Sequence, residues 1–191
     1  EIPRRGAIRA YLQGGRRKGA RAIISHLDTL GAQVRSLEDN GRLGITSIGH
    51  WSARFAESCR CTIFSETGAY RGTILPLKAS GHTYNEEIDD QPIGWDHVEI
   101  RVDAFARKRA DLVKLGLDVG DIVAIDPGTE FLDNGFIVSR HLDNKAGVAV
   151  MLAALKALVE SGKPTPVDIY WLFSIAEEVG VGASSLLTPD I

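Results

Sequence analysis

Long apolar runs, cysteines and an excess of positive charge are all scarce in this 191-residue sequence. The longest apolar stretches, such as residues 169–173, are far too short to cross a bilayer. Residues 1–5 lack the apolar core of a secretory signal, although an upstream segment could have been lost. We therefore expect a soluble protein that does not insert into membranes.

The two cysteines, Cys59 and Cys61, lie two residues apart, so a strand would point both to one face. That spacing does not favour a local disulfide, and the pair alone lacks the partners of a metal site. A reduced, cytoplasmic chain is the expected setting. The net charge of −3 gives no reason to expect nucleic acid, and the basic residues 16–18 read first as a solvated turn.

Hydrophobic residues make up 44% of the sequence and charged residues 25%, which is typical of a globular protein. The length suits one large domain or two small ones. Residues 22–27 read as a buried strand. A β-rich region follows, in which short strands alternate with Gly, Asp and Asn turns, and its expected strands are residues 61–64, 70–75, 98–102 and 122–125. We expect this region to form a small barrel or sandwich.

Two helices are expected. One interrupts the β-rich region, with Phe105, Leu112 and Leu115 near one face and Gly116 as its C-terminal stop. The second begins after Asp143, ends near residues 161–164, and carries apolar residues at helical spacing: Val148, Met151, Leu152, Leu155, Leu158 and Val159.

An apolar strand over residues 167–175 follows the second helix. A strand that is apolar on both faces is typical of a parallel sheet covered by helices on both faces. We therefore predict an α/β domain, residues 1–34 and 137–191, interrupted by a β-rich, barrel-like insert at residues 35–136.

Three polar motifs follow the predicted α/β strands or open the long helix: His26-Leu27-Asp28, His141-Leu142-Asp143 and Glu177-Glu178. Ligands of open α/β sheets lie beyond the carboxyl ends of the strands, so the motifs are placed to share a site. Adjacent glutamates after a buried strand would be costly unless a cation or hydrogen bonds compensated them. Imidazole and carboxylate suit zinc or a similar divalent ion.

Each motif has competitors. His-Leu-Asp occurs twice, and a second Glu-Glu pair lies in the polar stretch 81–90, which we expect to be a loop of the insert. His82 with this acidic run is a less favoured second metal site. A lone His-x-Asp is common by chance, and paired glutamates usually mark a solvated surface, so it is their combination that points to function.

The motifs at residues 24–31 (ISHLDTLG), 139–147 (SRHLDNKAG) and 173–180 (FSIAEEVG) resemble the metal-site motifs of the M42 peptidases. These are glutamyl-aminopeptidase-like metallo-aminopeptidases with two metal ions. Residues 115–121 (LGLDVGD) are similar to a turn of the family's insert. The resemblance implies a zinc-peptidase-like sheet domain carrying an insert that lies against the metal site and helps to form a homo-oligomer.

The resemblance also implies roles for particular residues. His26 would ligate one metal ion, Asp143 would bridge both, and Glu178 would ligate the other. Asp28 would orient His26, and Glu177 would be the general base, accepting a proton from a metal-bridging water. Two divalent ions, zinc or cobalt, are the implied cofactors.

The chain departs from the family pattern at both ends. The helix that precedes the first motif is missing, and so are a further carboxylate ligand and a late histidine. We therefore expect a truncated chain that would be inactive by itself. A finer resemblance, at residues 49–57 (GHWSARFAE) and 77–83 (LKASGHT), is to an M42 branch associated with the osmoprotectant N-acetylglutaminylglutamine amide. A packed corner of the insert explains His50 and Trp51 equally well.

The expected activity is hydrolysis of N-terminal residues from peptides. Rival functions are a related two-metal carboxypeptidase or amide deacylase acting on a small amide, and a binding protein that retains the motifs without catalysis.

Overall fold

The computed structural model describes residues 1–4, 6–184, 186–189 and 191, with the backbone but not the side chains of residues 16–18. The chain forms two compact units. One unit combines Glu1–Thr29 with Thr129–Ile191, and the other is Leu30–Gly128. The insert was predicted at residues 35–136, whereas the second unit spans Leu30–Gly128, so both predicted boundaries lie several residues too far along the chain. An insert beginning at residue 35 would cut strand β3 (Gly31–Leu37), which pairs with two strands of the second unit.

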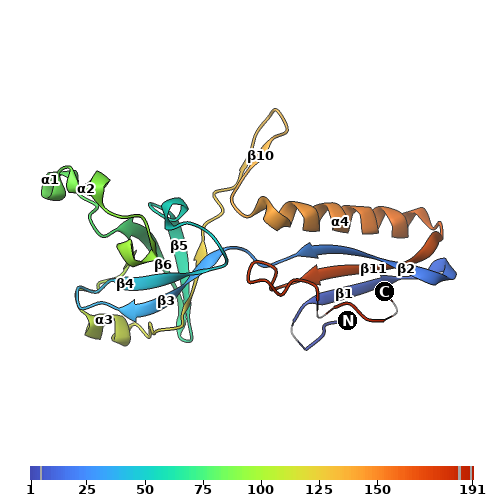
Figure 1. The fold of residues 1–191 in the computed structure, drawn as a ribbon, viewed down its shortest axis with the longest axis horizontal. Helices are drawn as coiled ribbons and strands as arrows, with labels where there is room; N and C mark the ends of the chain where they lie inside the picture. Colours follow the sequence, from blue (N-terminus) through green and yellow to red (C-terminus); the bar gives the residue numbers. More distant parts are fainter. Residues whose placement is uncertain (5, 185, 190) are drawn as a thin grey trace. The chain divides into compact units, whose positions relative to one another are not determined.

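The first unit contains a three-stranded sheet, in the order β1 (Ile8–Leu12), β11 (Thr165–Ser174) and β2 (Gly14–His26). The central strand β11 runs parallel to β2 and antiparallel to β1. Helix α4 (Leu142–Ser161) lies along one face of this sheet (Figure 1). The strand–helix–strand arrangement and the long helix were both predicted from apolar periodicity, and the α/β class is confirmed.

Strand β11 is buried on both of its faces. Trp171 and Phe173 pack with Val148 and Met151 of α4. Leu172 points the other way and clusters with Ala7 and Leu186. Alternate side chains of a strand face opposite sides of the sheet, which explains the continuous apolar run. Among the described residues, the second face meets non-helical segments and not the second helix layer that we expected.

Strand β2 is longer than predicted. Residues 16–18, expected as a turn, have strand backbone, and their side chains lie outside the described part of the structure. The polar start of β2 is fixed by its partner strand, because Gly14 pairs with Thr165 and its amide donates to Asp168 at 2.7 Å. A Cβ at Gly14 would lie 2.2 Å from the carbonyl carbon of Val167, so this close pairing requires glycine. Strand β1 was not predicted.

The second unit is a closed antiparallel barrel in the order β3-β4-β7-β6-β5-β8. Its remaining strands are β4 (Leu43–Ile48), β5 (Arg60–Ser65), β6 (Gly68–Pro76), β7 (Val98–Val102) and β8 (Ile122–Ile125). Every other residue of these strands points inward, and the fully buried core includes Ile45, Ile63, Ile74, Ile100 and Val123. The four strands predicted inside this region and its barrel-like character are confirmed.

Helix α3 (Arg109–Lys114) is shorter than expected. Leu112 is fully buried, but Phe105 lies before the helix and is 97% exposed, so its expected place on the buried face was wrong. Spacing alone misled here, because Phe105 is separated from the helix by bends. The stretch 81–90 contains two single-turn helices, α1 (Gly81–Tyr84) and α2 (Glu87–Asp90), where a loop was expected.

The remaining elements are small. Two 3-10 turns lie at Ala53–Phe55 and Trp95–His97. The Trp51 indole packs edge-on against Trp95 and donates to the carbonyl of Gly31, which agrees with the packed-corner interpretation for Trp51, whereas His50 is exposed. Strands β9 (Glu130–Phe131) and β10 (Ile137–Val138) form a hairpin in the first unit. No helix in the described ranges combines the length and apolar character needed to cross a membrane.

Cys59 and Cys61 are buried in the barrel, and Cys61 is a free thiol. Burial raises the pKa of Cys61 to about 12, with Asp126 adding to the effect. Because the thiolate is the reactive form, Cys61 is expected to resist alkylation in the native protein at pH 8. Mass spectrometry after iodoacetamide treatment should find Cys61 modified in denaturant and unmodified without it. Rapid native labelling would show that the barrel opens readily at β5.

Candidate metal centre

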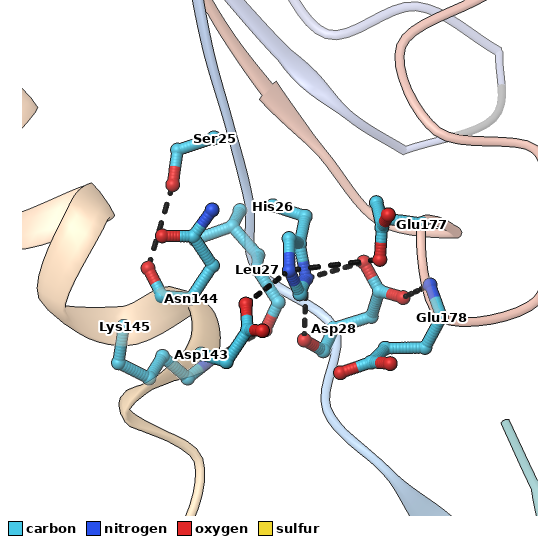
Figure 2. A network of polar contacts seen from close by, with 9 residues as sticks. All are labelled: Ser25, His26, Leu27, Asp28, Asp143, Asn144, Lys145, Glu177 and Glu178. Carbon is cyan, nitrogen blue, oxygen red and sulfur yellow. Dashed lines mark hydrogen bonds and ion pairs between the residues drawn. The ribbon is translucent and has the colours of Figure 1, made fainter. Parts of the chain in front are cut away.

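The candidate site lies where β2 and β11 end side by side. In their parallel pairing, His26, the last residue of β2, is the register partner of Ser174, the last residue of β11. Glu177 and Glu178 follow β11 by three and four residues. Asp143 lies at the start of α4. The parallel register therefore brings together three motifs that are far apart in sequence (Figure 2).

His26 is the centre of the polar network and is only 5% exposed. Its Nδ1 lies 3.0 Å from the backbone carbonyl oxygen of Asp28. A carbonyl can only accept, so Nδ1 carries the proton. The Nε2 atom faces two carboxylates, at 3.0 Å from Asp143 Oδ1 and 3.7 Å from Glu177 Oε2. With Nδ1 protonated, Nε2 needs either a second proton or a cation between it and these oxygens.

The electrostatics of the site favour positive charge. Burial opposes protonation of His26 and is the largest single effect, but hydrogen bonds to Asp143 and Asp28 and the nearby carboxylates outweigh it, so the pKa of His26 is raised. Burial also raises the pKa of the Glu178 carboxyl, with His26 opposing the shift and Glu177 adding to it. The pKa of His26 is therefore raised by its carboxylate neighbours, whereas the pKa of Glu178 is raised mainly by burial.

Glu177 and Glu178 complete the cluster. One ligand atom each from His26, Glu177 and Glu178 lie within 4.8 Å of one another. Asp143 is not in this closest group, although its carboxylate is hydrogen-bonded to His26 and its side chain is 88% exposed. The structure thus gathers all five residues singled out in the sequence, and it places Glu177 among the three closest donors.

Asp28 connects the end of β2 to the glutamate segment. Its Oδ2 accepts the backbone N–H of Glu178 at 3.0 Å. Its Oδ1 is buried, has no hydrogen-bond partner among the described residues, and lies 3.6 Å from His26 Nδ1. Asp28 thus contacts the His26 ring twice, through its carbonyl at 3.0 Å and its carboxylate at 3.6 Å, and the same carboxylate also holds the backbone of Glu178.

A small cavity of about 220 Å³ opens beside the cluster, and its lining includes Ser25, His26, Asp143, Asn144, Ser174 and Glu177. A larger hollow of about 660 Å³ lies on the barrel. We assign the site to the smaller cavity, because the larger one is lined mainly by loop and apolar residues around Phe64 and Val119 and brings no imidazole near its carboxylates.

The donor set fits a divalent metal. One imidazole nitrogen with carboxylate oxygens is typical of zinc and related ions, and the orphaned Asp28 oxygen shows that the polar groups here are not satisfied by the protein alone. Among the described residues, this is the only such cluster of His, Cys, Asp and Glu. The alternative site at His82 and the second Glu-Glu pair is not brought together.

One contact was not predicted. The ammonium of Lys145 donates to the backbone carbonyl of Leu27, which lies between His26 and Asp28. Lys145 is part of the second motif, but only the folded structure shows where its side chain points.

The fold and cluster together define an α/β chain with a histidine–carboxylate centre of the kind that holds divalent cations. The family described as M42 glutamyl aminopeptidase matches residues 6–191. The chain belongs to this family.

Individual relatives agree with this assignment. YhfE of Bacillus subtilis (strain 168) is 36% identical over 187 residues, covering 97% of this chain and 54% of YhfE. The aminopeptidase APDkam598 of the archaeon Desulfurococcus kamchatkensis matches with a TM-score of 0.79 at 29% identity, covering 95% of this chain and 47% of that one.

The TET1 peptidase of Pyrococcus horikoshii matches with a TM-score of 0.80 at 22% identity, covering 97% of this chain and 54% of that one. At that identity, the likeness supports the fold alone. The chain spans about half the length of the proteins that it matches.

Proposed function

We propose that the full-length protein is a metal-dependent aminopeptidase that removes N-terminal residues from peptides. The observation that carries the proposal is the placement of His26 Nε2 against Asp143 and Glu177, at the joined ends of two parallel strands. Membership of the M42 family supports the reaction class.

The proposed cofactors are two divalent ions, zinc or cobalt. His26 would hold one ion, Glu178 the other, and Asp143 would be shared by both. Bound divalent ions lower the pKa of water and stabilise the oxyanion that develops on the scissile carbonyl. The exposed Asp143 carboxylate can turn toward both ions, since only its contact with His26 restrains it among the described hydrogen bonds.

Glu177 is the proposed proton acceptor for the attacking water. Its side chain is 54% exposed and lines the cavity, so it can reach both substrate and water. Asp28 is a positioning residue, because it binds the backbone of Glu178 and accepts from the His26 ring through its carbonyl. The two adjacent glutamates thus have different tasks: Glu178 is partly buried and anchored, whereas Glu177 is open to the cavity.

A homo-oligomer in the cytoplasm is the proposed setting. The Pyrococcus horikoshii TET1 peptidase assembles into a tetrahedron or a large octahedral shell. We propose that the full-length protein also self-assembles, without assigning it a particular shell.

The function is tested with purified full-length protein loaded with zinc or cobalt. Aminoacyl anilides should be cleaved, and their N-acylated counterparts should not, because an aminopeptidase requires a free amino group. Preference for blocked amides would instead identify an amide deacylase, and release of C-terminal residues a carboxypeptidase. A protein that binds metal but hydrolyses none of these substrates would be a binding protein.

A further inference from the structure

The Leu27 peptide group links all three motifs of the site. Its N–H donates to the carbonyl of Ser174 at 2.7 Å, which ties the end of β2 to the end of β11. Its carbonyl accepts from the Lys145 ammonium, which ties the same point to the first turn of α4. Leu27 lies between His26 and Asp28, so Lys145 reaches the backbone that carries both residues (Figure 2).

The start of α4 is not held by regular helical geometry. His141 has a left-handed backbone with φ of 65°, and Asp143 and Asn144 are non-helical. Two other described contacts join this turn to β2: the Ser25 hydroxyl donates to the Asn144 carbonyl at 3.4 Å, and Asp143 Oδ1 lies 3.0 Å from His26 Nε2, although the rest of the Asp143 side chain is mostly in solvent. Because the backbone here is irregular, the position of Asp143 depends on such side-chain contacts, and the hydrogen bond from Lys145 to Leu27 is one of them.

Lys145 makes its hydrogen bond to Leu27 without neutralising the negative charge of the carboxylate cluster. Its ammonium bonds to a neutral carbonyl, and no ion pair joins it to a carboxylate within the described ranges. The Asp143 oxygens consequently remain free for His26 and for a cation. A hydrogen bond from a charged donor is stronger than a neutral one, so a single contact can hold the turn.

We infer that Lys145 is a positioning residue that holds the first turn of α4 against β2, so that Asp143 faces His26 at cation-binding distance. The inference rests on the proposed metal function of that cluster. Partners outside a coordination shell that orient the ligands typically change metal affinity by about 10–100-fold when removed. Lys145 would act on affinity through Asp143, without touching the ion.

The test compares three variants of the full-length protein. Lys145→Met removes the donor and keeps the length of the side chain, and Lys145→Arg keeps a cationic donor. Lys156→Met is the matched control, because Lys156 lies on the same helix and forms a surface ion pair with Glu160. Zinc affinity is measured by competition with a chelating dye. Hydrogen exchange of the peptide spanning residues 141–149 is measured in metal-free protein.

Lys145→Met is expected to weaken zinc binding by about 10–100-fold and to speed exchange at the start of α4. Lys145→Arg should restore most of both properties, and Lys156→Met should match the wild type. If Lys145→Met exchanges hydrogen faster at residues 141–149 but binds zinc as tightly as the wild type, the inference is overturned. Lys145 would then have a structural role only. A raised KM with unchanged affinity would overturn it in favour of a substrate contact. Absence of zinc binding by the wild type itself would refute the proposed function, and this inference with it.

Discussion

Replacing Glu177 with Gln in the full-length protein is expected to lower kcat by about 10²–10⁴-fold, the usual contribution of general acid–base catalysis. Glutamine keeps the size of the side chain and its hydrogen-bonding oxygen, but it cannot accept a proton from water. Glu177 is half exposed and lines the cavity beside His26, so the change should not disturb packing. Steady-state hydrolysis of an aminoacyl anilide measures the loss.

The metal content of Glu177→Gln should stay at the wild-type level, because His26, Asp143 and Glu178 remain. Glu160→Gln, an exposed position on α4, is the matched control and should leave both hydrolysis and metal content unchanged. Wild-type turnover by Glu177→Gln would refute the proposed base. Loss of metal together with activity would instead assign Glu177 to the coordination shell, where its closeness to the other donors also allows it to act.

Replacing Asp143 with Ala is expected to remove bound metal altogether, since both ions would share this carboxylate. Hydrolysis should fall to the level of metal-free enzyme. The measurement is elemental analysis of protein that has been loaded with zinc and then dialysed against a weak chelator. Folding should be preserved, because Asp143 is 88% exposed and contributes little burial.

Asp133→Ala is a suitable control for that experiment, because Asp133 is an exposed aspartate in the β9–β10 turn of the same unit. It should retain the wild-type metal content. Retention of both ions by Asp143→Ala would contradict the shared-ligand role. Retention of one would show that Asp143 serves a single ion.

Much of the fold could be predicted because its strongest signals are periodic. Val148 and Met151 recur at helical spacing, and Trp171 to Phe173 is apolar on both faces, so α4 and β11 were recognisable from sequence. The start of β2 was not recognisable, because its polar residues are in a strand only through pairing with β11. The prediction for Phe105 was wrong for a different reason. Its spacing from Leu112 fits a helix, but Phe105 lies before α3 begins and its side chain is exposed.

The members of the candidate site could also be proposed from sequence, because parallel strands end at one edge and their following residues must meet there. The contacts within the site could not. Nothing in His-Leu-Asp shows that the His26 ring would bond to the backbone of Asp28 while the carboxylate turned to Glu178. Such choices depend on how neighbouring segments approach, which is a property of the tertiary structure.

The most direct test is a crystal structure of the full-length protein soaked with zinc, with anomalous scattering used to place the metal. The account predicts two zinc peaks at the ends of β2 and β11, each at about 2.0–2.2 Å from its ligands. One should contact His26, the other Glu178, and both Asp143. Zinc absent from this position in a fully soaked crystal, or bound there without His26 and Glu178, would contradict it.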